Sequence, residues 1–286
     1  MSTLISILID GVSYGVVLFV IAVGLSITMG LMRVVNMAHS GFAMMGGFAA
    51  AAIVAMGVRF EIATVLAVLI VAAISLPVER LLMRRVYGKS ELEQALLTIG
   101  LVYIVIAGCN SLFGATVTSL TFPSYVTGPI TILGHTAAKY RIVLIGIGSL
   151  LALLLWFFLE RSDFGLKVRA AVDNAATAQT LGINTSRLYA VAFAAGAGMA
   201  ALGGVLGSQL MPMEPSYALK YLILVLAVVT VGGLGTIGGT FAAALLLGIL
   251  DTAAKYLLPE IASTAFYLVM FLVLIVRPQG LFGRTA

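Results

Sequence analysis

Nine apolar segments that are long enough, or nearly long enough, to cross a lipid bilayer follow one another along the 286-residue chain. A helix needs roughly 20 mostly apolar residues to span the hydrocarbon core. Apolar residues make up 62% of this chain and charged residues only 9%, whereas charged residues form about 25% of a soluble domain. No soluble fold has enough interior to bury this much apolar surface, so the sequence predicts a polytopic membrane protein.

The predicted fold is an all-α membrane protein, because an open sheet would leave backbone groups without hydrogen bonds in lipid. Three of the segments are short, so we expect a polytopic helix bundle of eight to nine transmembrane spans with re-entrant or broken helices. Residues 1–286 are expected to form one transmembrane domain. The predicted spans are Leu4–Leu31, Ser40–Met56, Ile62–Leu82, Gln94–Phe113, Ile142–Leu159, Leu188–Met211, Leu219–Val231, Thr240–Leu257 and Ile261–Val276.

Lys and Arg residues are unevenly divided between the two ends of these spans. The positive-inside rule assigns the richer side to the cytoplasm, which places the N-terminus outside and the C-terminus inside. The predicted cytoplasmic residues are Arg33, Arg80, Arg84, Arg85, Lys89, Arg161, Lys167, Arg169, Arg187, Arg277 and Arg284. The predicted outer residues are Arg59, Lys139, Arg141, Lys220 and Lys255.

The largest cytoplasmic connection, residues 160–187, has the composition of a folded segment. Leu166–Thr180 is rich in Ala and other helix formers, and Gly182 follows as a helix stop. This helix is too polar to span, so we expect it to lie across the inner face of the membrane. It either rests on its own bundle or on lipid headgroups, or it offers a patch to a partner. Its expected apolar face comprises Val168, Val172, Ala175 and Ala176.

Four stretches carry a resemblance to a known family: "RAAVDNAATAQTLGINTSRLYAVAFAAGAGMAALGGVL" (169–206), "GVSYGVVLFVIAVGLSITMGLMRVVNMAHSGF" (11–42), "VGGLGTIGG" (231–239) and "RPQGLFG" (277–283). Together they resemble the LivH-type branched-chain amino acid ABC transporter permease family nearly end to end. The sequence departs from the family at residues 36–41, "NMAHSG". The family commonly shows Asn-x-Ala-His-Gly-Ser there, so the last two small residues are exchanged.

The resemblance implies a permease subunit of an importer in the bacterial inner membrane, with a periplasmic N-terminus and a cytoplasmic C-terminus. It would carry leucine, isoleucine, valine or related small amino acids by alternating access, although relatives import urea, short amides or aromatic acids. The implied partners are a second related permease, two ATPase subunits and a periplasmic solute-binding protein. In the family an Ala-rich helix docks on the ATPase, which assigns ATPase coupling to Leu166, Arg169, Val172, Ala175, Ala176, Leu181 and Gly182.

A polar interruption separates the first two spans. Arg33, Asn36 and His39 lie three residues apart, a spacing that puts them roughly on one helix face. Polar groups in lipid are costly, so that face should meet protein or water, and Gly41 allows close helix approach or a break. One interpretation is a loop capped by Asn36 in which His39 binds a backbone carbonyl. The alternative is that Asn36 and His39 line the substrate path or its cytoplasmic gate.

A second glycine-rich stretch, Thr230–Gly248, echoes the first, since "GGFAAAAI" at 46–53 resembles "GGTFAAALL" at 238–246. Interrupted apolar segments at corresponding positions of two halves indicate a transport site. The glycines serve either tight helix packing or an unwound turn along the path. The candidate path residues from this stretch are Gly232, Gly233, Gly235 and Gly238.

The sequence offers no catalytic or metal-binding constellation. Gly88-Lys89-Ser90 is not a phosphate loop, because that motif requires glycine where Met83 stands. We therefore predict a transport subunit that is not an enzyme and holds no metal or cofactor, with ATP and Mg²⁺ on partner ATPases. Ser90 and Glu93 form a predicted capping box. The rival hypothesis, a secondary transporter or channel acting alone, usually requires buried acidic residues.

Two acidic residues near span ends have predicted structural roles. Asp251 and Lys255 are four residues apart near the outer end of a span, which predicts an ion pair. Asp10 is expected to be a carboxylate at a helix start or at an interface between helices.

Overall fold

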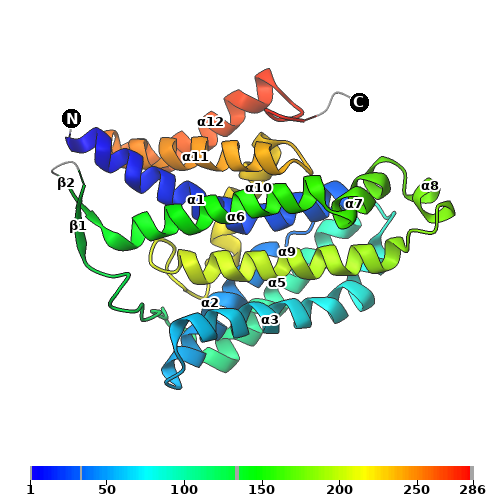
Figure 1. Cartoon of the computed structure of the whole chain (residues 1–286), viewed down its shortest axis with the longest axis horizontal. Helices are drawn as coiled ribbons and strands as arrows, with labels where there is room; N and C mark the ends of the chain where they lie inside the picture. The colour runs from blue at the N-terminus through cyan, green and yellow to red at the C-terminus, as the bar shows by residue number, and fades with distance from the viewer. Residues whose placement is uncertain (1, 33, 133–134, 284–286) are drawn as a thin grey trace.

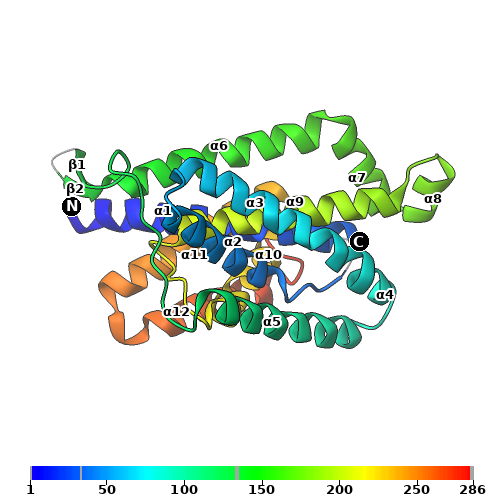
Figure 2. The same ribbon diagram turned by 90° about the horizontal axis from the view of Figure 1, so that it is seen from below.

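The computed structural model describes residues 2–32, 34–132 and 135–283, so the predicted cytoplasmic residues Arg33 and Arg284 lie outside the described residues. Within these ranges, nine apolar helices form a bundle, and each coincides with a predicted span (Figures 1 and 2). They are α1 (Ser2–Met32), α2 (His39–Ala55), α3 (Phe60–Val78), α5 (Glu91–Phe113), α6 (Lys139–Arg161), α9 (Thr185–Gly207), α10 (Tyr217–Gly232), α11 (Ile237–Leu257) and α12 (Ala262–Val276).

The helices differ in whether they can cross a bilayer alone. Among the described residues, six helical stretches are long and apolar enough to do so, and α2, α10 and most of α12 are shorter apolar helices. The predicted all-α membrane bundle is therefore present. The unequal lengths follow from the sequence, because polar or Gly- and Pro-containing segments precede α2 and α10.

Helices α1 and α9 form the centre of the bundle, and α1 also packs along α11. Glycines permit the closest crossings. A Cβ atom on Gly24 would lie 2.4 Å from the Gly196 carbonyl oxygen, and one on Gly15 would lie 2.6 Å from the Ala244 carbonyl oxygen. Small residues are the usual means of helix association in lipid, where apolar burial supplies little driving force. Helices α3, α5 and α6 expose many large apolar side chains, as lipid-facing helices do.

The two ends of the bundle carry different additions. At one end, β1 (Pro129–Ile132) and β2 (His135–Ala138) pair antiparallel in a short hairpin close to the N-terminus (Figure 1). At the opposite end lie α7 (Asp163–Asp173) and α8 (Ala175–Thr180) (Figure 1). The hairpin is an addition to the predicted all-α fold and lies outside the apolar helices.

The prediction of one helix over Leu166–Thr180 is wrong, because α7 and α8 are separate. Asn174 between them is extended, with φ −155°, and its side-chain oxygen accepts a hydrogen bond from the Thr177 N–H at 3.0 Å. Asn is a favoured N-cap residue, so the chain ends one helix there and starts another.

Two predicted local interactions are confirmed. Ser90 and Glu93 form the reciprocal capping box at the start of α5. Lys255 and Asp251 are paired at 2.6 Å on α11.

The extension that follows the C-terminal end of α3 is irregular. A π-helical segment, η1 (Glu79–Met83), and a short α4 (Arg84–Val86) follow α3, and Pro77 lies inside the last turn of α3. A 3-10 turn, η2 (Pro259–Ile261), joins α11 to α12.

Candidate transport site and coupling surface

The connection from α1 to α2 turns back into the bundle. His39, the first residue of α2, donates from Nε2 to the Ile21 carbonyl oxygen at 2.9 Å. Ile21 precedes the end of α1 at Met32 by about 16 Å of helix, at 1.5 Å per residue. Because a hydrocarbon core is about 30 Å thick, α2 begins roughly halfway along the bundle.

The interpretation of this connection as a loop capped by Asn36, with His39 bound to a backbone carbonyl, is confirmed, whereas the helical spacing of the polar residues is not realised. Residues 34–36 are not helical, and residues 37 and 38 form a turn. A non-helical backbone at this depth is tolerated only where protein covers it and satisfies its polar groups. The chain meets this requirement with side chains from another helix.

Gln94 and Thr98 of α5 hold the non-helical segment. The Gln94 side-chain oxygen accepts from the Val35 N–H at 3.0 Å, and the Thr98 hydroxyl lies 3.4 Å from the Val35 carbonyl oxygen. Both side chains are buried. Gln94 was predicted only as the first residue of a span, and neither Gln94 nor Thr98 was predicted to hold this segment. Their spacing of four residues in an otherwise apolar helix was the available signal.

Asn36 and His39 are buried, at 2% and 1% exposure. The Asn36 side-chain oxygen accepts from the Ala38 N–H at 3.1 Å, so the hydrogen bonds expected of a capped turn are present. Within the described part of the chain, Asn36 Nδ2 and Ser40 Oγ have no hydrogen-bond partner. An unpaired buried donor costs about 1–3 kcal/mol. The start of α2 can therefore offer hydrogen bonds to a polar group that reaches it.

The glycine-rich turn between α10 and α11 packs against α1 at Gly30, close to the end of that helix. Gly233 and Gly235 have φ angles of 96° and 75°, which disfavour any other residue. A Cβ on Gly30 would lie 2.4 Å from Gly235 Cα. The turn is thus both unwound and tightly packed, so features of both interpretations occur together.

The remaining predicted path glycines have different surroundings. A Cβ on Gly232 would meet Gly239 at 2.7 Å, whereas Gly238 faces open space among the described residues. A Cβ on Gly41 would lie 3.3 Å from a Val105 side-chain carbon, close to an ordinary contact. Of these three, only Gly232 is required by close backbone packing.

The α7–α8 pair projects beyond the bundle (Figure 2). Its inner face packs against the end of α1 near Met32 and the start of α9 through a small apolar cluster of Leu31, Val168, Ala171, Ala178, Leu188 and Ala192. Its outer face exposes two large apolar side chains, Leu166 at 61% and Leu181 at 75%. Exposed apolar side chains on a projecting element are typical of a contact surface for another chain.

The predicted apolar face of the coupling helix is partly wrong. Val168 is buried and Val172 and Ala175 are half-buried, but Ala176 is exposed. The restart at Asn174 changes the helical phase, which brings Ala178 inward instead. Arg169 donates to the Leu159 carbonyl oxygen and so attaches α7 to the end of α6. Gly182 has φ 82° in the turn after α8.

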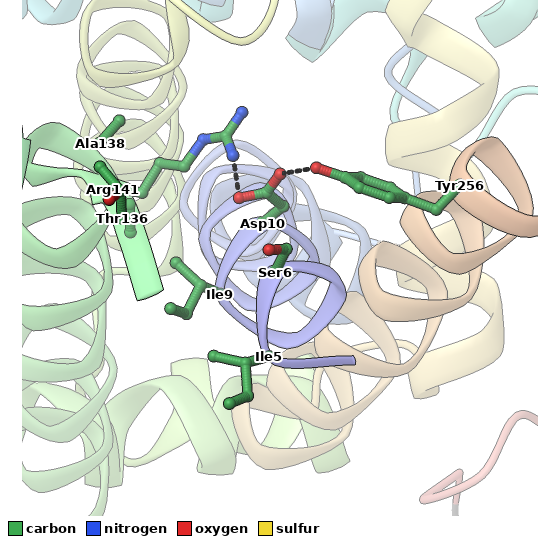
Figure 3. Close-up of a pocket in the computed structure, with 9 residues that line it drawn as sticks. Ile5, Ser6, Ile9, Asp10, Thr136, Ala138, Arg141 and Tyr256 are labelled. Carbon is green, nitrogen blue, oxygen red and sulfur yellow. Dashed lines mark hydrogen bonds and ion pairs between the residues drawn. The ribbon is translucent and has the colours of Figure 1, made fainter. Parts of the chain in front are cut away.

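A polar cluster at the opposite end joins three helices. Asp10 of α1 is paired with Arg141 of α6 and accepts a hydrogen bond from the Tyr256 hydroxyl of α11 at 2.7 Å (Figure 3). The three side chains line a cavity of about 110 Å³. Asp10 is therefore an interface carboxylate. Within the described residues, no group of three or more His, Cys, Asp or Glu side chains could hold a metal ion.

Comparisons with known proteins place this arrangement in context. The family model described as "Branched-chain amino acid transport system / permease component" matches residues 7–276. The high-affinity branched-chain amino acid transport system permease protein LivH of Escherichia coli K12 is 29% identical, and the alignment covers 96% of this chain and 94% of LivH. The corresponding permease protein BraD of Pseudomonas aeruginosa is 26% identical, with coverage of 97% and 95%.

A solved structure shares the fold. PsaBC from Streptococcus pneumoniae in complex with Fab contains a chain that aligns with a TM-score of 0.50 at 13% identity, covering 93% of this chain and 89% of that chain. At this identity the likeness concerns the fold alone.

Proposed function

The chain belongs to the family of branched-chain amino acid transport permeases, and on that premise we propose that it imports such amino acids by alternating access, driven by ATP hydrolysis on partner chains. It is a multi-pass membrane subunit of a transport system and not an enzyme. The observation that carries the proposal is the family match over residues 7–276 together with a polar break halfway along the bundle. Discontinuous helices with buried polar groups are a recurrent feature of transport sites.

We propose that Asn36, His39 and Gly41 contribute to the substrate path, together with the turn that contains Gly232, Gly233, Gly235 and Gly238. The unpaired Asn36 Nδ2 supports a role in contacting a polar solute. Because Asn36 and His39 are buried here, transport would require the start of α2 to separate from α1 or α5. The buried hydrogen bonds of Gln94 and Thr98 to Val35 would then keep the non-helical segment attached to α5 during this movement.

We propose that α7 and α8 dock on an ATPase subunit that carries ATP and Mg²⁺. The exposure of Leu166, Ala176 and Leu181 supports this role. The apolar cluster beneath the pair connects it to the ends of α1 and α9. The proposed coupling residues are Leu166, Arg169, Val172, Ala175, Ala176, Leu181 and Gly182.

The proposed complex contains this permease, a second related permease, two ATPase subunits and a periplasmic solute-binding protein. We propose the bacterial inner membrane as its location, with the N-terminus periplasmic and the C-terminus cytoplasmic. The uneven division of Lys and Arg residues supports this orientation. The start of α1 also lies at the opposite end of the bundle from α7 and α8, which supports the same orientation (Figure 1).

The test is uptake into proteoliposomes that contain the complete complex, with ATP inside and the loaded binding protein outside. We expect labelled leucine, isoleucine or valine to accumulate only with hydrolysable ATP. Competition by urea, short amides and aromatic acids identifies the substrate class. Uptake driven by an ion gradient in the absence of ATP would contradict the proposal and favour a transporter that acts alone.

A further inference from the structure

A fully buried carboxylate lies beside the proposed coupling surface. Glu79 follows the last residue of α3, and its side chain is 0% exposed. A buried carboxylate is costly unless it is paired and hydrogen-bonded. Arg84 Nε lies 3.1 Å from one Glu79 oxygen and 3.3 Å from the other, and the Tyr87 hydroxyl donates to the first oxygen at 3.1 Å.

The π-helical segment η1 makes this pairing possible. At 3.6 residues per turn, residues five apart in an α-helix lie about 140° from alignment. In η1 the Arg84 N–H instead bonds to the Glu79 carbonyl oxygen, the i→i+5 bond that defines a π-helix. This bond brings residues 79 and 84 together on one side. Pro77 lacks an N–H and so already interrupts the α-helical ladder two residues earlier. Single π turns are frequent at functional positions.

Arg84 and Tyr87 reach beyond the segment to two other helices. Arg84 Nη2 donates to the Ser186 carbonyl oxygen at 3.1 Å. Ser186 lies in the first turn of α9, the helix that follows α8. The Tyr87 hydroxyl also lies 3.3 Å from Met32 Sδ at the end of α1. The Tyr87 ring packs edge-on against Tyr189 of α9, with centroids 5.7 Å apart.

Two residues that contact Tyr87 also contact the inner face of α7 and α8. Met32 and Tyr189 pack against the apolar cluster that contains Val168, Ala171 and Ala178 of α7 and α8. Burial, reinforced by the nearby Glu79 carboxylate, holds the pKa of Tyr87 above its usual range. The phenol therefore remains a hydrogen-bond donor at physiological pH.

We propose that Glu79, with Arg84 and Tyr87, is the positioning residue that transmits movement of α7 and α8 to α1 and α3. The inference rests on the proposed ATP-driven import. When α7 and α8 move, they displace the end of α1 and the start of α9 through the shared apolar cluster. Arg84 and Tyr87 contact these two helices and are bonded to Glu79, so α3 moves with them. Because the segment after Met32 leads directly to Asn36 and His39, the same displacement reaches the start of α2.

The experiment measures ATP hydrolysed and amino acid imported in the same proteoliposomes. Glu79→Gln removes the charge at nearly constant volume, and Tyr87→Phe removes one hydroxyl while leaving the ring contact with Tyr189. We expect both variants to assemble and to hydrolyse ATP in response to the loaded binding protein. Import per ATP should fall by about tenfold, within the range usual for coupling between two sites. Arg85→Gln, an exposed neighbour, is the matched control and should keep the wild-type ratio.

Each outcome decides the matter. A wild-type ratio in Glu79→Gln and Tyr87→Phe would overturn the proposal. If Glu79→Gln fails to assemble, Tyr87→Phe alone decides. Failure of Tyr87→Phe to assemble would also overturn it, because the contacts would then serve folding. If the wild-type complex itself shows no ATP-dependent import, the proposed function fails, whichever result the variants give.

Discussion

The two ends of the bundle each carry an acid paired with an arginine and a tyrosine, but the two clusters are built differently. Asp10, Arg141 and Tyr256 come from α1, α6 and α11 and line a small cavity (Figure 3). Glu79, Arg84 and Tyr87 lie within nine residues of chain around a π turn, and Glu79 is fully buried.

This difference indicates that the two clusters have different roles, one in stability and one in transmitting movement. The cluster around Asp10 joins helices that already pack closely, since α1 and α11 meet through Gly15 and Gly248. It therefore adds stability to a fixed arrangement. The cluster around Glu79 is local, and its outward contacts end on Ser186 and Met32, next to the α7–α8 pair. It is placed to transmit movement.

The largest expected effect is at the proposed coupling surface of α7 and α8, beyond the Glu79 cluster. Ala176→Glu places a carboxylate on the exposed face of α8, and docking would then bury an unpaired charge at a cost of several kcal/mol. We expect normal membrane insertion with loss of ATPase copurification and of uptake. The measurement is ATPase recovered with tagged permease. Ala115→Glu makes the same change at an exposed residue at the end of the bundle away from α7 and α8, and should retain the ATPase. Equal recovery from both variants would remove α8 from the coupling surface.

A smaller effect is expected midway between the clusters. Asn36→Leu keeps the side-chain volume roughly constant but removes the acceptor of the Ala38 N–H and the free amide. Uptake should fall by about tenfold, corresponding to about 1.4 kcal/mol, with unchanged expression and assembly. Asn110→Leu, the same change on α5, is the control: it also removes an unpaired buried amide atom, but one that does not belong to the connection before α2, and it should transport normally. Unchanged transport in Asn36→Leu would restrict this residue to capping the turn.

A change in the Asp10 cluster should separate stability from coupling. Asp10→Asn removes the charge that faces Arg141, and Arg141 is partly exposed and so partly hydrated. We expect a loss of about 1 kcal/mol in stability, as for partly solvated ion pairs, measured as a lower thermal unfolding midpoint in detergent. Import per ATP should match the wild type. A changed ratio would show that both clusters take part in coupling.

The smallest expected effect comes from the closest chemical match between the two clusters. Tyr256→Phe removes the same atom as Tyr87→Phe, and its hydroxyl bonds to Asp10 at 2.7 Å at the edge of the cavity. Because Tyr256 is 47% exposed, water can replace part of this bond, and the cost to stability should be about 0.5 kcal/mol, with no change in import per ATP. If Tyr256→Phe lowers that ratio as much as Tyr87→Phe does, the contrast between the clusters is wrong.

The sequence by itself determined the helices and the interactions between residues that are close together along the chain. Apolar runs predicted a bundle of eight to nine helical spans, because lipid demands internally bonded backbone. The capping box of Ser90 and Glu93 and the pair of Asp251 and Lys255 were also predictable, because each joins residues three or four apart. The family resemblance of residues 169–206 also predicted an ATPase-coupling role for this segment, and that role stays a prediction.

Only the tertiary structure decided which distant residues pair with the polar side chains and hold the non-helical segment before α2. The sequence predicted a loop before the second span, but it could not show that Gln94 and Thr98, about 60 residues away, would hold that loop inside the bundle. Asp10 meets Tyr256 across 246 residues, and Arg84 meets Ser186 across 102. The periodicity of apolar residues reports which face of a helix is covered but not which distant side chain covers it. A buried polar group depends on that partner, because in lipid no water can take the partner's place.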